Sequence, residues 1–238
     1  MRRMAWMGVA LLAACTAIAE EPTGPWSGSL GLSYIATSGN SDTGSLGIEA
    51  TVKRKPEPWG LEISALAFRA EQDGVKTADR AFGRARVQMA LSGSWDVFGG
   101  VTVEQDDFAG LDLRAVAEAG ATFKALTGPE HVLSFDIGAT YTREELTDAE
   151  NRDYAGALAG VTYAYVLSEG AKITERLMFY PSFDETDDWR LSSETAAQAV
   201  LSRRFALKLA YILRYDNVPP IGYTSTDTTT TASLVWSF

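Results

Sequence analysis

Cysteine and histidine are almost absent from this chain, which has Cys15 as its single cysteine and His131 as its single histidine. One cysteine excludes an internal disulfide. It also leaves no thiol cluster for zinc, and a hydrolase usually needs a histidine beside its nucleophile or water. His131 stands just after Pro129, where a hydrogen-bonded structural role in a turn is the simpler interpretation. We therefore predict that the protein is not an enzyme and has no catalytic residue, cofactor or metal site.

Positive charge and long apolar runs are also scarce. The chain has 21 Lys and Arg against 31 Asp and Glu, a formal net charge of −10. This balance argues against nucleic-acid binding, which needs basic patches to displace counterions from phosphates. Beyond the first residues, no apolar stretch approaches the ~20 residues that a transmembrane helix needs. Membrane-crossing β-strands alternate lipid-facing and lumen-facing residues, so the mean hydropathy of −0.07 remains compatible with a membrane protein.

The first residues have the pattern of a cleaved targeting segment. Arg2 and Arg3 precede a short apolar stretch, and Ala17-Ile18-Ala19 supplies a small-residue cleavage pattern. We predict a signal peptide over residues 1–19 and a single mature domain over residues 20–238. A second interpretation stays open, because Leu12-Ala13-Ala14-Cys15 resembles a lipobox, with Cys15 as the acylated first residue of a lipoprotein. Under either interpretation the protein is exported.

The rest of the chain consists of short segments whose residues alternate with period two. In the last segment, Leu234, Trp236 and Phe238 share one face and Ser233 and Ser237 the other. The segments lie near the length of about 9–11 residues at which tilted strands cross a bilayer. Hydrocarbon demands that every backbone hydrogen bond be made, so a spanning sheet must close. We predict an all-β fold, a transmembrane antiparallel up-and-down β-barrel of about 12 strands with both termini periplasmic.

One segment fits this pattern less well than the others. Over residues 59–71, Leu66 and Phe68 fall on the face that should be polar. A slip of one residue would exchange the two faces of a strand. We therefore expect any misreading of the strand faces to be found in this third segment.

The connections alternate in length, as periplasmic turns and outer loops do in such barrels. Short turns are predicted at residues 55–58, 92–94, 127–130, 168–170 and 202–204. Longer acidic loops are predicted at residues 72–79, 105–112, 144–153 and 216–226, with loops of middling length at 38–42 and 184–188. Aromatic residues concentrate at the segment ends, where a barrel places rings at the headgroup levels. They are Trp26, Trp59, Trp95, Phe123, Phe205, Trp236 and Phe238 near the turns, and Tyr34, Tyr141, Phe179, Trp189 and Tyr215 near the loops.

The polar face of the segments carries charges of both signs. In the predicted register, nine of these residues line the lumen: Glu49, Arg84, Arg86, Glu104, Arg114, Glu118, Glu194, Lys208 and Arg214. Barrels of about eight strands are filled by side chains, whereas those of about 16–18 strands leave an aqueous channel. An intermediate barrel with long charged interior side chains predicts a narrow or occluded pore.

Three stretches carry a family resemblance. They are Trp26-Ser27-Gly28 leading to Ser38-Gly39-Asn40-Ser41-Asp42, then Tyr215-Asp216-Asn217 with Pro219-Pro220 and Thr226-Asp227-Thr228, and finally Leu234-Val235-Trp236-Ser237-Phe238. Their order and spacing resemble the YdiY-like salt-induced outer-membrane proteins, a bacterial family of unknown function. The resemblance implies a β-barrel in the outer membrane of a Gram-negative bacterium, and brings no activity, substrate or catalytic residue.

The chain ends on an aromatic residue. Phe238, with Trp236 and Leu234 on the same face, resembles the signal that the barrel-assembly machinery recognises. We expect this machinery and outer-membrane lipid or lipopolysaccharide as partners, no nucleic acid, and a monomer.

Two features of the predicted outer loops leave alternatives open. Acidic pairs at 106–107, 144–145, 184–185 and 187–188 are interpreted as solvated charge, with Ca²⁺ or Mg²⁺ binding as the alternative. Pro219 and Pro220 stiffen a loop that either forms a plain hairpin or folds inward as a constriction.

The function predicted from the sequence is a narrow porin-like channel for small solutes or ions. Two alternatives stay open. One is a structural surface barrel with an occluded lumen and no transport, and the other is a soluble periplasmic β-barrel that binds a ligand.

Overall fold

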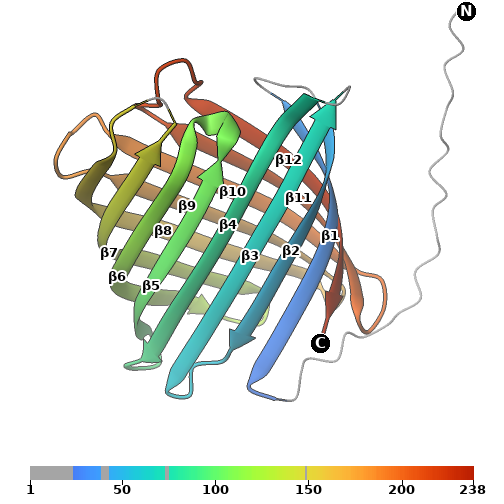
Figure 1. Ribbon diagram of the computed structural model, residues 1–238. Coiled ribbons are helices and arrows are strands. Elements are labelled where there is room, and N and C mark those ends of the chain that lie inside the picture. The colour runs from blue at the N-terminus through green and yellow to red at the C-terminus, as the bar shows by residue number, and fades with distance from the viewer. Residues whose placement is uncertain (1–23, 39–42, 73–74, 148) are drawn as a thin grey trace, which may run out of the picture.

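The computed structural model describes residues 24–38, 43–72, 75–147 and 149–238, which form a closed barrel of twelve antiparallel strands (Figure 1). Each strand pairs with its neighbours in the chain, and the last pairs with the first. The strands are β1 Trp26–Ser38, β2 Thr43–Arg54, β3 Trp59–Gln72, β4 Val75–Ala90, β5 Trp95–Asp106, β6 Leu111–Thr127, β7 His131–Leu146, β8 Arg152–Ser168, β9 Ala171–Pro181, β10 Trp189–Val200, β11 Phe205–Asp216 and β12 Thr226–Ser237. The predicted all-β fold, an antiparallel up-and-down barrel of about 12 strands, is confirmed, and the periplasmic position of both termini stays a prediction.

Some of the predicted features lie outside the described residues. They are the signal peptide, Cys15 and most of the loop at 38–42. The short 3-10 helix η1, Asp107–Ala109, joins β5 to β6. Among the described residues, no helix has the length and apolar character needed to cross a membrane.

The seam between β1 and β12 closes the barrel up to the last residue. Gly28 and Phe238 exchange two backbone hydrogen bonds of 3.0 Å, and Leu32 stands opposite Leu234. The Phe238 ring covers Gly28, where a Cβ atom would come within 2.2 Å of it. Every strand therefore has a partner on both sides, which removes the exposed edges that hydrocarbon does not tolerate.

The two ends of the barrel differ in their connections (Figure 1). At one end, which we call the turn end and which also carries the C-terminus, short turns join β2 to β3, β4 to β5, β6 to β7, β8 to β9 and β10 to β11. These turns occupy the predicted positions, and Ser92 and Ser202 each accept a hydrogen bond from the backbone of the following strand, at 3.2 and 3.3 Å. We call the opposite end the loop end.

At the loop end, three loops are shorter in the structure than predicted from the sequence. The segment expected at 72–79 is mostly strand and those expected at 105–112 and 144–153 are about half strand, because β3 and β4, β5 and β6, and β7 and β8 continue their ladders into them. The strands have 11 to 17 residues, and all but β9 exceed the roughly 9–11 residues that a tilted strand needs to cross hydrocarbon. Backbone pairing does not depend on the membrane boundary, so polar and acidic residues continue the sheet beyond it.

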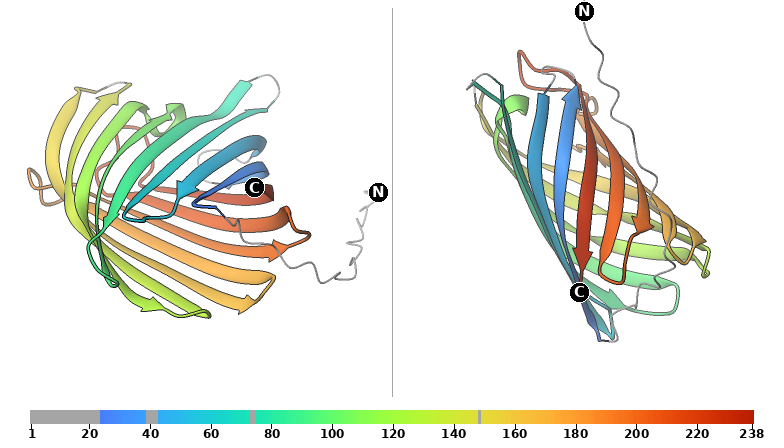
Figure 2. Two further views of the ribbon diagram at one scale, coloured as in Figure 1. Left: turned by 90° about the horizontal axis from the view of Figure 1, so that it is seen from below. Right: turned by 90° about the vertical axis from the view of Figure 1, so that its right-hand side faces the viewer.

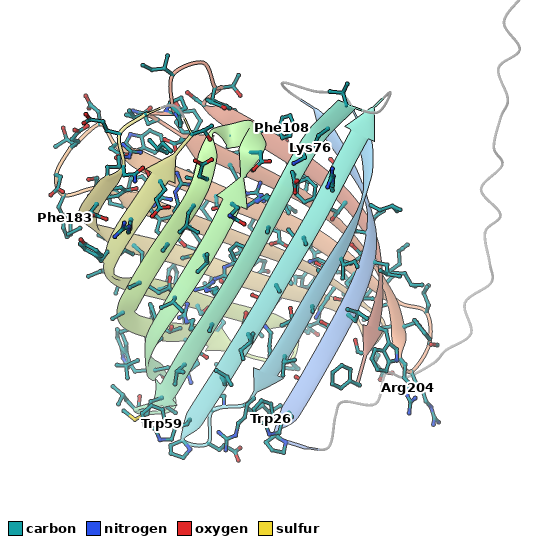
Figure 3. All side chains as sticks on the ribbon, in the orientation of Figure 1. Trp26, Trp59, Lys76, Phe108, Phe183 and Arg204 are labelled. Atoms are coloured by element: carbon teal, nitrogen blue, oxygen red, sulfur yellow. The ribbon has the colours of Figure 1, made fainter. Side chains whose placement is uncertain are left out.

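Apolar and aromatic side chains cover the outer surface of the barrel. Leu46, Ile48, Ile137 and Leu209 are each more than half exposed. At the turn end the rings of Trp95 and Phe123 lie 4.9 Å apart and those of Trp236 and Phe238 5.0 Å apart. At the loop end Trp189 lies between Phe179 and Tyr215, at 5.8 and 5.0 Å. Figure 3 shows Trp26 and Trp59 at the turn end and Phe108 at the loop end. These rings form an aromatic band at each end of an apolar surface, as in a membrane-spanning barrel.

The third strand keeps the register that its sequence left in doubt. Leu66 pairs with Phe82 and Phe68 with Arg80, without a slip, so both apolar side chains face inward. Phe68 packs with Ala70, Ala78 and Leu66 as a small apolar cluster inside the barrel. The interior is therefore not uniformly polar.

Candidate functional site: the barrel lumen

The inward side chains surround a cavity of about 640 Å³ that extends along the barrel. Its wall runs from Lys53, Lys172 and Val235 near the turn end to Asp216 and Thr224 at the loop end. Figure 2 shows the strands, strongly tilted, surrounding this interior. Because consecutive residues of a strand point to opposite sides, a mostly polar set of alternate residues in each strand faces the cavity while a mostly apolar set faces outward.

Of the nine residues predicted to line the lumen, eight stand on the cavity wall: Glu49, Arg84, Glu104, Arg114, Glu118, Glu194, Lys208 and Arg214. Arg86 also points inward but is buried beside the cavity. It donates hydrogen bonds to Asp136 at 2.9 Å and to Thr122 at 3.0 Å, and its guanidinium stacks 3.6 Å above the Phe98 ring. The role of these residues in conduction stays a prediction.

A network of arginines and carboxylates fills the loop end of the lumen. Arg114 on β6 contacts Glu144 at 2.5 Å, Asp216 at 3.4 Å and Glu104 at 3.8 Å. Arg80 on β4 binds Glu104 as well. Asp216 belongs to β11, far round the barrel from β6 in the strand order, so the contact between Arg114 and Asp216 crosses the lumen. Ion pairs therefore narrow the loop end.

Glu144 is the centre of this network, contrary to its prediction as a solvated loop residue. Its side chain is fully buried and faces Arg114, Arg152 at 2.6 Å and Arg190 at 3.8 Å. Tyr154 donates a hydrogen bond to it at 3.0 Å. The difference arises because β7 continues to Leu146, so that Glu144 points inward while Glu145 points outward. Burial of a carboxylate requires such cationic partners.

Asp188 joins the same network from the loop between β9 and β10. It lies 3.0 Å from Arg152. Burial raises the pKa of the Asp188 carboxyl, while Arg152 acts in the opposite direction. Among the described residues, no group of three or more His, Cys, Asp or Glu side chains is arranged to hold a metal ion. The acidic residue predicted here as solvated charge is thus buried against an arginine.

The loop 217–225 bends over the loop end of the cavity. Pro219, Pro220 and Thr224 form part of the cavity wall. The Tyr223 ring lies against Gly110, where a Cβ atom would come within 2.5 Å of it. Gly110 follows η1 in a left-handed conformation, with φ of 69°, which favours glycine. Of the two alternatives for this loop, the structure has the inward one, with Tyr223 contacting the β5–β6 connection across the mouth.

An uncharged ring separates the loop-end network from the charges nearer the turn end. On β4, Phe82 stands between Arg80 and Arg84, and on β6, Val116 stands between Arg114 and Glu118. The ring continues in this wall with Leu66, Met178, Tyr180 and Ile212. This ring was not predicted from the sequence. The available signal was an apolar residue on the inward face of a strand, with an inward charge two positions before it and another two positions after it.

Between this ring and the turn end, most lysines and arginines have a carboxylate partner. Arg84 binds Glu118 at 2.6 Å, Lys53 binds Glu62 at 3.0 Å and Lys124 binds Asp96 at 2.8 Å. Lys208 lies 3.2 Å from Glu194 and 3.6 Å from Glu49. These pairs join strands one to three positions apart in the barrel order. The ion pair between Arg114 and Asp216 at the loop end, in contrast, joins strands five positions apart.

His131 lies away from the lumen, at the turn end and on the outer face. Its Nδ1 atom is 2.8 Å from the Tyr163 hydroxyl, and its ring stacks on Tyr165 at 4.9 Å. A hydrogen-bonded histidine in the aromatic band agrees with the structural interpretation of its sequence position.

The family described as "Protein of unknown function, DUF481" matches residues 30–238. The chain belongs to this family. The uncharacterized protein YdiY of Escherichia coli (strain K12), a relative of this DUF481 chain, is 27% identical over 214 residues, which are 90% of this chain and 83% of YdiY. The predicted YdiY-like family is confirmed.

Solved structures similar to this DUF481 chain are outer-membrane barrels. The NanC porin has a TM-score of 0.60 at 9% identity, over 87% of this chain and 98% of the porin. An outer-membrane channel from Pseudomonas putida F1 has a TM-score of 0.56 at 11% identity, over 95% and 100% of the two chains. The KdgM porin in complex with disordered oligogalacturonate has a TM-score of 0.51 at 8% identity, over 88% and 99%. These likenesses show the fold, and together with the apolar, aromatic-banded outer surface they place this DUF481 protein in a bacterial outer membrane.

Proposed function

We propose that the barrel is a narrow porin-like channel that passes small solutes or ions across the outer membrane. The observation that carries the proposal is the cavity whose charged and hydroxyl-bearing wall runs from the turn end to the loop end. Polar side chains along a passage replace part of the hydration shell of a solute, and rings of charge select its sign. In this proposal Glu49, Arg84, Arg86, Glu104, Arg114, Glu118, Glu194, Lys208 and Arg214 set the ion preference.

Single-channel conductance of the detergent-purified mature protein in a planar lipid bilayer tests this proposal. We expect small, discrete and reproducible conductance steps, because the passage is narrow. Alanine replacement of Glu49 and Glu194 together should change the conductance or the ion preference, since both carboxylates stand on the wall. Protein that is shown separately to be folded and inserted, yet never conducts, would contradict the channel.

A structural barrel with a sealed lumen is the second candidate. The contact between Arg114 and Asp216 across the lumen and the Tyr223 ring against Gly110 favour it, because both narrow the loop end. The sealed barrel predicts no conductance from inserted protein in the same bilayer experiment. A soluble periplasmic barrel would be released without detergent, and the apolar outer surface argues against that outcome.

Membrane assembly is part of the proposal. The chain closes its own barrel through the β1–β12 seam, which needs no second copy, so we propose a monomer surrounded by outer-membrane lipid and lipopolysaccharide. Leu234, half exposed on the outer face, and Phe238 at the seam would be read by the barrel-assembly machinery together with Trp236 before the barrel closes.

A further inference from the structure

The cavity wall has the opposite balance of charge from the whole chain. The chain has a formal net charge of −10. The wall, in contrast, carries ten Lys and Arg side chains and eight Asp and Glu side chains among the described residues. A passage whose wall is more basic than the protein around it favours negatively charged solutes over positive ones.

Two cations of β9 account for the excess of positive over negative side chains on the cavity wall. Lys172 and Arg176 stand on the cavity wall, and neither lies within 4.0 Å of a carboxylate oxygen of the described residues. Glu194 stands opposite Arg176 in the β9–β10 register, yet its carboxylate contacts Lys208 at 3.2 Å. Arg214 likewise has no carboxylate oxygen within 4.0 Å among the described residues. It stands opposite Asp227, which has no lysine or arginine nitrogen within 4.0 Å among these residues, so the two charges offset each other in the balance of the wall.

The surroundings of Lys172 and Arg176 increase their need for an anion. Lys172 is within electrostatic range of Lys53 and Lys208, and Arg176 is within range of Arg84 and Arg86 as well as of Glu62. Like charges in a partly dehydrated passage repel, so an anion that enters is stabilised by several cations at once.

The spacing of the two cations suits successive contacts with a moving solute. Lys172, Thr174 and Arg176 are alternate residues of β9 and share its inward face. Four residues of an extended strand separate points about 13 Å apart, at about 3.3 Å per residue. Thr174 supplies a hydroxyl donor between them. A lysine ammonium and an arginine guanidinium both donate charge-assisted hydrogen bonds to the oxygens of carboxylates and phosphates.

We infer that the inward face of β9 is an oxyanion-binding path, in which Lys172 and Arg176 successively bind the carboxylate or phosphate group of a small solute. This inference rests on the proposed channel function and specifies its substrate class. The uncharged ring next to Arg176, with Met178 and Tyr180 on the same strand, then contacts the remaining part of the solute.

Reversal potentials in a potassium chloride gradient, together with calorimetric titration of inorganic phosphate and of acetate into the detergent-solubilised barrel, test the inference. The wild-type barrel should be anion-selective and should bind at least one of the two anions. The double variant Lys172→Gln/Arg176→Gln should lose the binding and roughly tenfold of the anion preference, the lower end of the focusing expected from a charged passage.

Two control variants separate local charge from total charge and from folding. Arg203→Gln/Arg204→Gln removes the same charge from the exposed β10–β11 turn and should leave selectivity and binding unchanged; Figure 3 places Arg204 there, outside the lumen. Lys172→Arg/Arg176→Lys keeps both charges and should retain anion preference and binding.

The outcomes distinguish this inference from the proposed function. A conducting barrel whose selectivity is unchanged by Lys172→Gln/Arg176→Gln overturns the oxyanion path and leaves the channel in place. An inserted barrel that never conducts overturns the channel. The titrations then show whether the barrel still binds an anion at Lys172 and Arg176. Absence of both phosphate and acetate binding to that folded barrel overturns the inference as well.

Discussion

At the residue scale, the interior is governed by how completely each buried charge is neutralised. Glu144 has no exposed surface, and its oxygens face the guanidinium groups of Arg114, Arg152 and Arg190. An ion removed from water loses hydration that only close opposite charges and hydrogen bonds replace. Glu145, the next residue, is partly exposed on the outer face and contacts Arg143 at 3.4 Å. Two adjacent glutamates of one strand therefore contribute very differently to stability.

The substitution Glu144→Gln tests this difference. It removes the anion from between three arginines, which leaves Arg190 without a carboxylate within 4.0 Å among the described residues and Arg114 and Arg152 with one partner fewer. This loss should lower the free energy of unfolding by about 3 kcal/mol or more. Urea unfolding of the barrel in detergent, followed by the shift between folded and unfolded gel mobility, measures it. Glu145→Gln is the matched control and should change stability by less than about 1 kcal/mol, as for an exposed pair. Equal effects of the two substitutions would contradict the buried network.

At the element scale, the approach of β6 to β7 depends on two facing glycines. Gly120 and Gly138 are register partners, and a Cβ atom on Gly120 would lie 2.2 Å from the Ile137 carbonyl oxygen and 2.8 Å from the Phe98 ring. The Arg86 guanidinium lies over the Phe98 ring, 3.6 Å from its centroid. The absence of two side chains on these strands thus allows an aromatic ring and an arginine to be layered inside the barrel.

The substitution Gly120→Ala should disturb this layer. The added methyl group meets backbone atoms that cannot move aside without distorting the strand pair, so we expect a loss of about 1–3 kcal/mol, the usual cost of overpacking. Gly83→Ala on β4 is the control, because a Cβ atom there meets no atom within 4 Å. The folded fraction after heating in detergent measures both. A Gly120→Ala barrel as heat-resistant as the Gly83→Ala barrel would show that the strands adjust freely.

At the scale of the whole molecule, the two ends of the barrel differ in how far side-chain contacts reach across the lumen. The loop end is crossed by the Arg114–Asp216 contact and by Tyr223 lying against Gly110, whereas the ion pairs nearer the turn end join strands no more than three positions apart. The narrowest part of the passage should therefore be at the loop end. The loop 217–225 is held there by Asn217, which donates a hydrogen bond to the Asp187 carbonyl oxygen at 2.8 Å.

The substitution Tyr223→Ala should widen this mouth. Because the ring would no longer lie against Gly110, we expect the unit conductance in a planar bilayer to rise while the barrel stays folded. Ile221→Ala, in the same loop, is the control, since Ile221 is almost fully exposed. An unchanged conductance for Tyr223→Ala in a conducting barrel would place the narrowest point elsewhere, at the Arg114–Asp216 contact or the uncharged ring.

The sequence by itself determined which side of each strand faces inward. Period-two alternation assigns the faces of a strand without knowledge of its partners, so the inward position of residues such as Glu49, Arg84 and Lys208 followed from local pattern alone. Even β3, where Leu66 and Phe68 blurred the pattern, keeps the same parity. The turn-end connections were equally local, because Pro, Gly and Ser mark them in the chain.

Only the tertiary structure decided where strands end and which charges meet. Backbone pairing extends β7 past the point where its composition becomes acidic, which turns Glu144 from an expected loop residue into a buried one. Arg114 and Asp216 are 102 residues apart, and they meet because the tilt and closure of the barrel bring β6 and β11 to the same level of the lumen. The same closure leaves Lys172 and Arg176 without carboxylate partners in the described part of the chain. Pairing across a lumen depends on tilt and stagger around the whole barrel, which no single strand encodes.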